Sequence, residues 1–228
     1  MNFQGHSIRS FVTRTGRQTA SQRRGCEMGF PKWGMDSSSG ILDWNKTFGF
    51  CGRRVVEIGF GMGDSLIQTA HSSPNTQFVG IEVYLPGIGR LLNKIDKNGL
   101  RNIRVYAEDA IEVFESSLAH DSIDAINVFF PDPWHKKRHI KRRLIRPPFI
   151  AMLAKRLRLN GIIHLVTDCY AYAEQMSVAL EDAVELKNLS KCGQFVSRPP
   201  FRPITKFEKR AIALGNAVWE LMYWRQVP

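Results

Sequence analysis

The segment from Val55 to Ala70 limits the fold of this chain more than any other. A short β-branched run, Val55 to Ile58, meets the glycine-rich turn Gly59 to Gly63, and Asp64 is well placed to cap a helix that ends near Ala70. Glycines allow sharp turns and close approach of the backbone to a ligand. The pattern predicts a strand, a glycine turn and a helix.

The rest of the chain repeats this alternation. Further strands are expected at 77–83, 102–106, 123–130 and 162–166, with a closing pair at 193–196 and 217–224 that is separated by a loop and a short helix. Helices are expected at 86–97, 110–118, 147–160 and 170–186. Alternating strands and helices imply an α/β fold with a doubly wound, mostly parallel, seven-stranded sheet. The ligand crevice should lie at the carboxyl ends of the strands.

Acidic residues occur in or after five of the expected strands. Glu82, about 20 residues beyond the glycine turn, can accept hydrogen bonds from ribose hydroxyls, and Asp109 can accept from an adenine amino group. Glu57 would repel a pyrophosphate but suits a cationic sulfonium or ammonium group. The turn is G-x-G-x-G and not G-x-G-x-x-G, so S-adenosylmethionine is favoured over NAD. The other acids are Asp132 and Asp168; helix capping or a solvated strand end is the alternative for each.

The loop Pro131-Asp132-Pro133-Trp134 follows the fourth strand and resembles a positioning device. Its two prolines fix the backbone and hold Asp132 in one direction at low entropic cost. An ordinary proline-rich turn with a structural tryptophan is the alternative. Seven cations follow without one acid, and their position beside the crevice favours phosphate contact over a merely solvated face; they are Lys136, Lys137, Arg138, Lys141, Arg142, Arg143 and Arg146.

The overall charge also points to a polyanion. The 228 residues carry a formal net charge of +11, which favours nucleic acid as the partner. Residues 1–40 are expected to form a basic, mobile arm, either a disordered tail or a clamp on RNA, ahead of a single domain at 41–228. The cations of this arm are Arg9, Arg14, Arg17, Arg23, Arg24 and Lys32.

Several classes of protein are not expected. No apolar segment approaches the ~20 residues that span a bilayer, and the N-terminus lacks the apolar core of a secretory signal, so a cytoplasmic protein without membrane contact is expected. The four cysteines are widely spaced, so reduced thiols are expected. No metal site is expected, because cations flank the i, i+4 pair His135 and His139. Near the end, Thr205 and Glu208 fit a helix N-terminus.

Together these motifs resemble the bacterial tRNA (guanine-N7-)-methyltransferases of the TrmB type. The similarity spans nearly the whole chain and is carried by RSFVTRTGR, VEIGFGMG, GIEVYLPG, FFPDPWHKKRH, VTD and RPITKFEKR. The joint occurrence of PDPW and TKFE behind the glycine turn is highly specific. The match is less clear in the part of the N-terminal arm after Arg24 and in the segment from Leu186 to Arg198.

The resemblance implies a Rossmann-like, class I S-adenosylmethionine-dependent methyltransferase fold and a set of roles. The residues implied to bind S-adenosylmethionine are Glu57, Gly59, Gly61, Gly63, Glu82, Asp109 and Asp132, with Asp132 also the catalytic acid. Those implied to hold the target nucleotide are Lys136, Asp168, Thr205, Lys206, Phe207 and Glu208. Contact with the RNA backbone is expected from Lys137, Arg138, Lys141, Arg142 and Arg143.

The implied reaction is methyl transfer to N7 of a guanine in the variable loop of tRNA (position 46). Three other functions stay open: an amino methyltransferase acting on another RNA base or a protein, a non-catalytic RNA-binding protein, and, more distantly, an NAD-dependent oxidoreductase. The sequence leaves undecided whether the protein is a monomer or a homodimer, which tRNAs it uses, and whether Trp134 stacks on the base or packs structurally.

Overall fold

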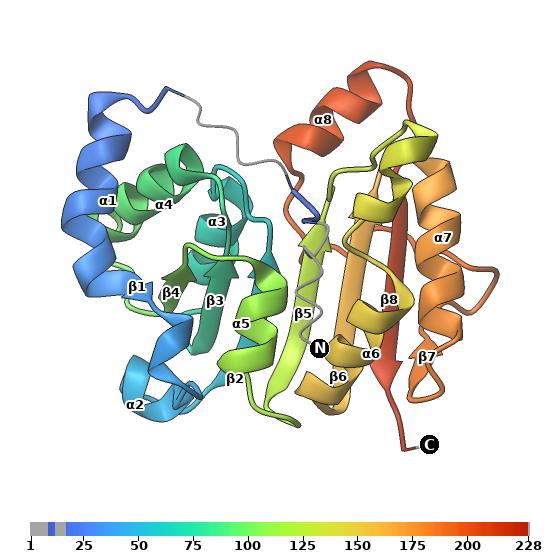
Figure 1. Cartoon of the computed structure of the whole chain (residues 1–228), viewed down its shortest axis with the longest axis horizontal. Coiled ribbons are helices and arrows are strands. Elements are labelled where there is room, and N and C mark those ends of the chain that lie inside the picture. Colours follow the sequence, from blue (N-terminus) through green and yellow to red (C-terminus); the bar gives the residue numbers. More distant parts are fainter. Residues whose placement is uncertain (1–8, 12–16, 228) are drawn as a thin grey trace, which may run out of the picture.

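The computed structural model describes residues 9–11 and 17–227 and has a central sheet with helices on both faces (Figure 1). Arg14 and the other residues of 1–8 and 12–16, all in the expected arm, lie outside the described residues, as does Pro228. The helices are α1 (Ala20–Trp33), η1 (Ser37–Ser39), α2 (Trp44–Phe48), α3 (Asp64–Ser72), α4 (Leu85–Lys97), α5 (Ala110–Ser116), η2 (Lys137–Arg142), α6 (Pro147–Arg156), α7 (Tyr170–Glu181) and α8 (Lys206–Ala213). The strands are β1 (Gly34–Met35), β2 (Arg53–Ile58), β3 (Thr76–Ile81), β4 (Ile103–Tyr106), β5 (Ile123–Phe129), β6 (Leu157–Thr167), β7 (Leu186–Asn188) and β8 (Trp219–Arg225).

The sheet confirms the predicted α/β architecture. Its strand order is β1-β4-β3-β2-β5-β6-β8-β7. The first six strands in this order are parallel to one another, whereas β8 is antiparallel to both β6 and β7. The order reverses at β2, which pairs with β3 on one side and β5 on the other. Such a reversal opens a crevice at the carboxyl ends of the strands, as the sequence predicts.

Two apolar clusters hold the layers together. One face of the sheet packs against α2, α5, α6 and α7, and the other packs against α3 and α4. Val56 and Ile58 of β2 point to the first cluster and Val55 to the second, which is the alternation of a strand buried on both faces.

Helix α1 is the main departure from the prediction, because residues 1–40 were expected to form a mobile arm. The helix packs closely on α4 through Gly25 and Gly29, where an added Cβ atom would meet Gly89 O at 2.1 Å and Leu92 Cβ at 2.7 Å. The mobile-arm expectation is therefore wrong for this part of the arm. Cys26, Phe30 and Trp33 of α1 also pack on the second cluster at helical spacing, but this short stripe lies among glycines and charged residues.

One local signal could have revealed α1. Thr19 caps the helix, its hydroxyl accepting from Gln22 N at 3.2 Å while the Gln22 side chain accepts from Thr19 N at 2.9 Å. This reciprocal pair is the capping box that T-x-x-Q signals. The segment after α1 adds β1 at the edge of the sheet, which gives eight strands and not seven.

The C-terminal part of the sheet also differs from the prediction. The outer partner of β8 is β7, which begins at Leu186, the residue where the expected helix was to end. No strand forms at 193–196 among the described residues. Helix α6 ends at Arg156, and β6 begins at once and contains Asn160, whose φ of 63° marks an irregularity where the pairing with β5 shifts register. Within the described residues, every helix is too short or too polar to cross a membrane.

Candidate cofactor and RNA site

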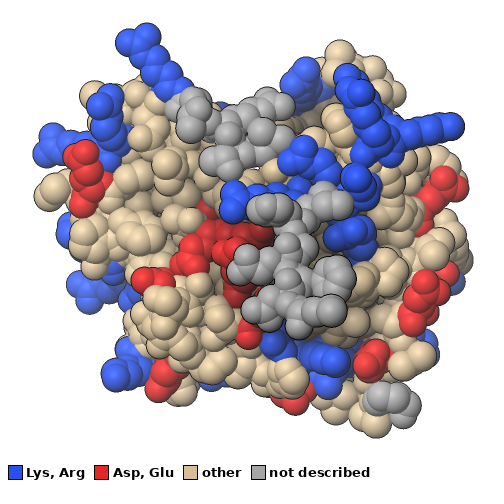
Figure 2. Space-filling model, in the orientation of Figure 1, with Lys and Arg blue, Asp and Glu red and all other residues tan. Residues whose placement is uncertain are grey.

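A cavity of about 800 Å³ lies at the carboxyl ends of the parallel strands. Its lining comes from the ends of β2, β3 and β5, from the segment after β4, and from Phe207 of α8. Figure 2 shows acidic side chains gathered in the middle of this face, with Lys and Arg side chains beside and above them. Of the residues implied by the resemblance, those that line the cavity are Gly59, Gly61, Glu82, Asp109, Asp132, Lys136 and Phe207.

The glycine turn and Glu82 are built as one unit. Gly59, Gly61 and Gly63 all have positive φ angles, between 57° and 73°, which side chains other than glycine adopt only with strain. The Glu82 carboxylate accepts from Gly61 N at 2.8 Å, Val83 N at 2.8 Å and Tyr84 N at 3.0 Å. Three backbone amides thus fix the carboxylate at the cavity wall, and a carboxylate has about four acceptor positions, so one remains for a ligand donor.

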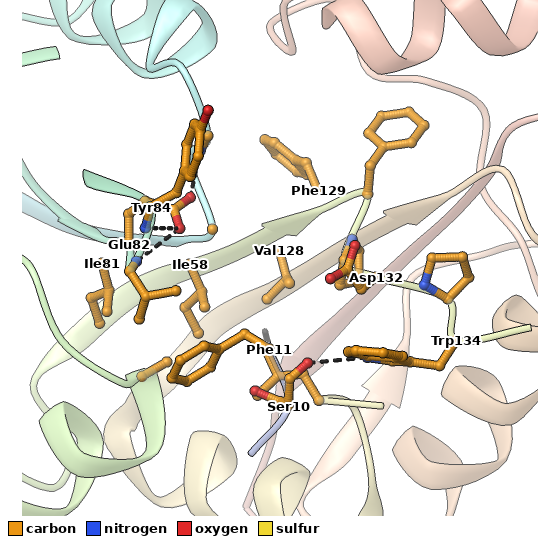
Figure 3. Close-up of a pocket in the computed structure, with 18 of the residues that line it drawn as sticks. Ser10, Phe11, Ile58, Ile81, Glu82, Tyr84, Val128, Phe129, Asp132 and Trp134 are labelled. Atoms are coloured by element: carbon orange, nitrogen blue, oxygen red, sulfur yellow. Dashed lines mark hydrogen bonds between the residues drawn. The ribbon is translucent and has the colours of Figure 1, made fainter. Parts of the chain in front are cut away.

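The segment after β4 supplies the next acid. Asp109 caps α5, accepting from Ile111 N at 2.9 Å through Oδ1, and it lines the cavity as well. The capping alternative is therefore correct, and it leaves Oδ2 for another donor. Ile58 and Val128 line the cavity between Glu82 and Asp132, and Ile81 lies beside Glu82 (Figure 3). An apolar floor with acids at its margin suits a flat ring that bears polar groups at its edge.

The proline loop forms the opposite side of the cavity. Phe130 and Trp134, on either side of Pro131 to Pro133, have φ angles of 53° and 48°, so the loop turns sharply at both ends. Asp132 is exposed and faces the cavity across from Glu82 (Figure 3). Burial raises the pKa of the Glu82 carboxyl, the three backbone amides oppose this, and the charge of Asp132 adds to the rise. Two facing carboxylates make the cavity favourable for a cation.

Trp134 is held by contacts within the chain. Its indole N–H donates to Ser10 O at 3.1 Å, and the Arg142 guanidinium lies 4.3 Å from its ring centroid. Arg142 also donates to Arg9 O at 3.2 Å and to Phe11 O at 2.9 Å. Residues 9–11, from the expected arm, thus lie against the proline loop. Figure 3 shows Phe11 between the proline-loop side of the cavity and the Glu82 side.

Arg143 is the clearest exception within the basic run. It is 5% exposed and its guanidinium donates to Pro133 O at 2.8 Å, to Gln175 Oε1 at 2.6 Å and to Ala171 O at 3.4 Å. The expectation that it contacts RNA phosphates conflicts with this burial. The exposed cations of the run are Lys136, Lys137, Arg138 and Lys141, whereas Arg142 is half-buried against Trp134.

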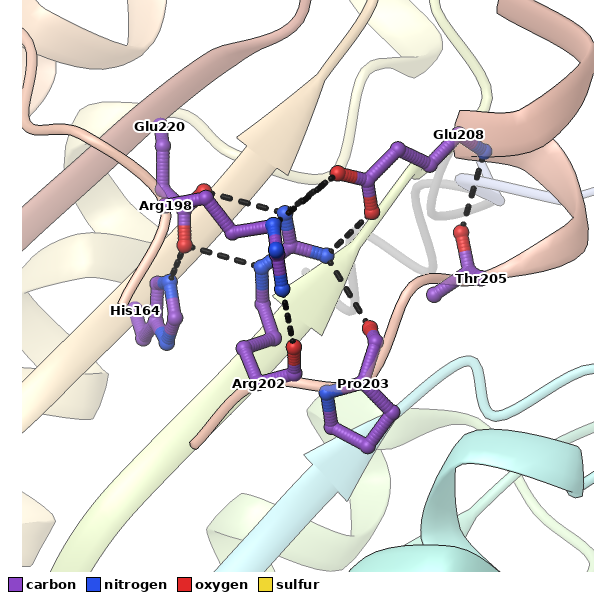
Figure 4. Close-up of polar contacts among 7 residues, drawn as sticks. All are labelled: His164, Arg198, Arg202, Pro203, Thr205, Glu208 and Glu220. Carbon is purple, nitrogen blue, oxygen red and sulfur yellow. Dashed lines mark hydrogen bonds and ion pairs between the residues drawn. The ribbon is translucent and has the colours of Figure 1, made fainter. Parts of the chain in front are cut away.

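The TKFE segment divides into buried and exposed residues (Figure 4). Thr205 caps α8, its hydroxyl accepting from Glu208 N at 3.1 Å, as the helix-start interpretation predicts. Glu208 is 4% exposed, and both its carboxylate oxygens accept from Arg202, at 2.7 and 3.0 Å. Lys206 and Phe207 are exposed, and Phe207 stacks on Phe130 with ring centroids 6.0 Å apart.

Arg202 links α8 to the sheet. Its guanidinium also donates to both oxygens of Glu220 in β8, at 2.8 and 3.0 Å, and Glu220 in turn bonds His164 of β6 (Figure 4). All these side chains are at most 5% exposed. A buried guanidinium that satisfies two carboxylates bidentately holds them in one geometry. Nothing in the sequence pattern pairs these residues, which lie up to 56 positions apart.

Several predicted site residues lie away from the cavity lining. Glu57 is buried in the middle of the sheet, opposite Gly80 of β3 and Asn127 of β5. Gly63 packs beneath the turn against Leu91, and Asp168 is exposed after β6. Asp64 does not cap α3, whose N-cap is Gly63; its carboxylate forms ion pairs with the side chains Arg90, Lys94 and Lys206.

Comparisons with known proteins agree with this architecture. Residues 52–221 match the family model described as "Putative methyltransferase". The chain is 44% identical over 223 residues to a protein of Ectopseudomonas mendocina named tRNA (guanine-N(7)-)-methyltransferase, covering 98% of this chain and 94% of that protein. A Chromohalobacter salexigens protein of the same name is 46% identical over 220 residues, covering 96% and 89%.

Solved structures share the fold at low identity. The 16S rRNA methyltransferase KamB has a TM-score of 0.61 at 14% identity, with 82% of this chain and 95% of that chain covered. The 16S rRNA (adenine(1408)-N(1))-methyltransferase of Catenulisporales acidiphilia has a TM-score of 0.53 at 14% identity, with 85% and 93% covered. The predicted class I methyltransferase fold is confirmed.

Proposed function

Because this chain belongs to the tRNA (guanine-N(7)-)-methyltransferase family, we propose that it transfers the methyl group of S-adenosylmethionine to N7 of a guanine in tRNA. The variable loop, at position 46, is the expected site of the guanine. Because its substrate would be tRNA, we propose that the enzyme acts in the cytoplasm. The observation that carries the proposal is an acidic cavity, with cations beside and above it, at the switch point of a class I fold.

The cavity residues fit the cofactor. The free acceptor position of Glu82 suits a ribose hydroxyl, and Asp109 Oδ2 suits an amino group at the edge of an adenine on the apolar floor. S-adenosylmethionine supplies an electrophilic methyl group on a cationic sulfonium. The Glu82 and Asp132 carboxylates favour that positive charge in a partly enclosed cavity, where charge interactions are stronger than in water.

The chemistry requires positioning more than proton transfer. Guanine N7 has an in-plane lone pair, so no base need remove a proton before attack. Attack leaves positive charge on the purine, and we assign Asp132 to stabilise it, because the loop holds an exposed carboxylate at the cavity mouth. The proline loop orients this group, and orientation of reacting atoms at contact distance supplies a large part of such rate enhancements.

The surface around the mouth suits RNA. Lys136 and Phe207 line the cavity, and Phe207 is 58% exposed beside Lys206, which suits a base stacked near phosphates. Lys137, Arg138 and Lys141 continue the positive surface along η2. We assign backbone contact to these three residues and substrate contact to Lys136, Lys206 and Phe207. Thr205 and Glu208 would act through α8.

The proposal is tested by incubating the protein with labelled S-adenosylmethionine and bulk tRNA, followed by nucleoside analysis and mapping of the labelled position. N7-methylguanosine in the variable loop supports it. Label on an amino-methylated base or on protein would instead support an amino methyltransferase. Binding of tRNA without transfer of label would support a non-catalytic RNA-binding protein.

A further inference from the structure

We propose that Arg143 is a positioning residue that holds the Asp132 loop in its reactive geometry, and that it does not contact RNA. This inference rests on the proposed function, since it concerns Asp132, the residue assigned to stabilise the charge on the methylated guanine. It separates Arg143 from the exposed cations that surround it in the sequence.

The first step is the contact between Arg143 and the loop. Arg143 Nε donates to Pro133 O at 2.8 Å, one residue beyond Asp132. Proline has no N–H, so the carbonyls are the main-chain groups through which Pro131 and Pro133 can be held by hydrogen bonds. The bond therefore fixes the peptide between Pro133 and Trp134, one residue beyond Asp132.

The second step is the anchoring of Arg143 itself. Its Nη1 donates to Gln175 Oε1 at 2.6 Å and to Ala171 O at 3.4 Å, both in α7, and the guanidinium lies 4.7 Å from the Tyr172 ring centroid. Gln175 Nε2 donates to Ile145 O at 3.1 Å, which holds the acceptor in place. The guanidinium is thus fixed by α7 on one side and holds the loop on the other.

The geometry also explains why a lysine would not serve here. The bonds to Pro133 and to α7 leave the guanidinium in different directions from Nε and Nη1, and a lysine has a single nitrogen on a flexible stem. A phosphate contact, in contrast, needs only the positive charge. Arg143→Lys therefore separates the two roles, because it keeps the charge and loses the fixed geometry.

The matched control is Lys141→Gln, two positions away. Lys141 is exposed at the end of η2, whereas Arg143 is 5% exposed. We expect Arg143→Lys to lower kcat at saturating tRNA and cofactor about 10- to 100-fold, as loss of alignment does. KM for tRNA and the salt dependence of tRNA binding should stay unchanged. Lys141→Gln should instead weaken tRNA binding and reduce the salt slope by about one unit.

A second variant keeps the test informative if Arg143→Lys destabilises the fold. Gln175→Leu removes the anchor but leaves Arg143 and its bond to Pro133, and we expect kcat to fall by roughly three- to tenfold, in proportion to lost alignment, with an unchanged KM for tRNA. Wild-type kcat in both Arg143→Lys and Gln175→Leu would overturn the inference. So would an Arg143→Gln variant whose salt slope falls as much as that of Lys141→Gln. Failure of the proposed function is distinct, because the unaltered chain would then methylate no guanine.

Discussion

The two sides of the cavity are built in different ways. The glycine side, made of Gly59 to Gly63 and Glu82 to Tyr84, is fixed by backbone amides that bond a carboxylate at the end of the next strand. The proline side, made of Phe129 to Lys136 and α8, is fixed by two buried arginines, Arg143 and Arg202. The first arrangement uses local turns, whereas the second uses side chains that reach across the fold.

This difference determines how much stability a substitution on each side should cost. Backbone amides are present in any sequence, so the glycine side depends on φ angles and on one acceptor. On the proline side each arginine satisfies several buried acceptors, and its loss leaves them without donors. Substitutions there should therefore cost more than substitutions on the glycine side, and four measurements test this ranking.

The largest effect on stability is expected at Arg202. Arg202→Met leaves the carboxylates of Glu208 and Glu220 buried without their cation, which should lower the free energy of unfolding by about 3–5 kcal/mol. Urea denaturation measures it. The matched control is Arg198→Met, whose ion pair with Glu208 is 3.8 Å long and whose side chain is 40% exposed, so its loss should cost less than about 1 kcal/mol. Equal losses of stability in Arg202→Met and Arg198→Met would contradict the special role of the buried arginine.

The next effect concerns turnover. Asp132→Ala should lower the rate of methyl transfer by about 10²–10³-fold, because a fixed carboxylate at the reacting group is lost. Affinity for S-adenosylmethionine should change less, since Glu82 and Asp109 remain. Single-turnover kinetics and calorimetric titration of the cofactor separate the two quantities. Unchanged turnover would remove Asp132 from the catalytic role.

Glu57, buried in β2 before the glycine turn, offers a test through pH. Burial raises the pKa of this carboxyl to about 7, from an ordinary 4.5. The folded chain therefore keeps a proton that the unfolded chain releases between pH 4.5 and 7, so the stability contributed by neutral Glu57 is lost as pH rises through this window. Glu57→Gln cannot ionise. It should match the unaltered protein near pH 4 and exceed its free energy of unfolding by about 3 kcal/mol at pH 8. A difference independent of pH would contradict this.

The smallest effect is expected at Glu82. The Glu82 carboxylate accepts from Gly61 N through Oε2 and from Val83 N and Tyr84 N through Oε1. Glu82→Gln keeps only one acceptor oxygen, so it cannot accept from both sets of amides. The free energy of unfolding should fall by about 1–3 kcal/mol. Calorimetry should show roughly tenfold weaker cofactor binding, equivalent to about 1.4 kcal/mol, with kcat at saturating cofactor less affected. A loss of stability larger than that of Arg202→Met would reverse the ranking of the two sides.

The prediction from sequence succeeded where structure follows local pattern. Four parallel strands and the glycine turn were predicted within a few residues, because strand periodicity and glycine φ preferences act over short segments. The same local rules located the cap at Thr205 and the proline loop after β5. They failed for α1, where Gly25 and Gly29 make the close contact with α4 and the apolar stripe is limited to Cys26, Phe30 and Trp33.

The sequence alone determined the fold class, the cavity edge and three of the five acids predicted there, because parallel strands bring their carboxyl ends together. Only the tertiary structure decided what each charged residue does. Arg143 is one of seven cations in its run and composition does not distinguish it from the other six, yet it is buried and bonded to Pro133. Burial and pairing depend on elements distant in the chain, here α7 for Arg143 and β8 for Arg202. Charge can be counted in a sequence, whereas its partner is set by the packing.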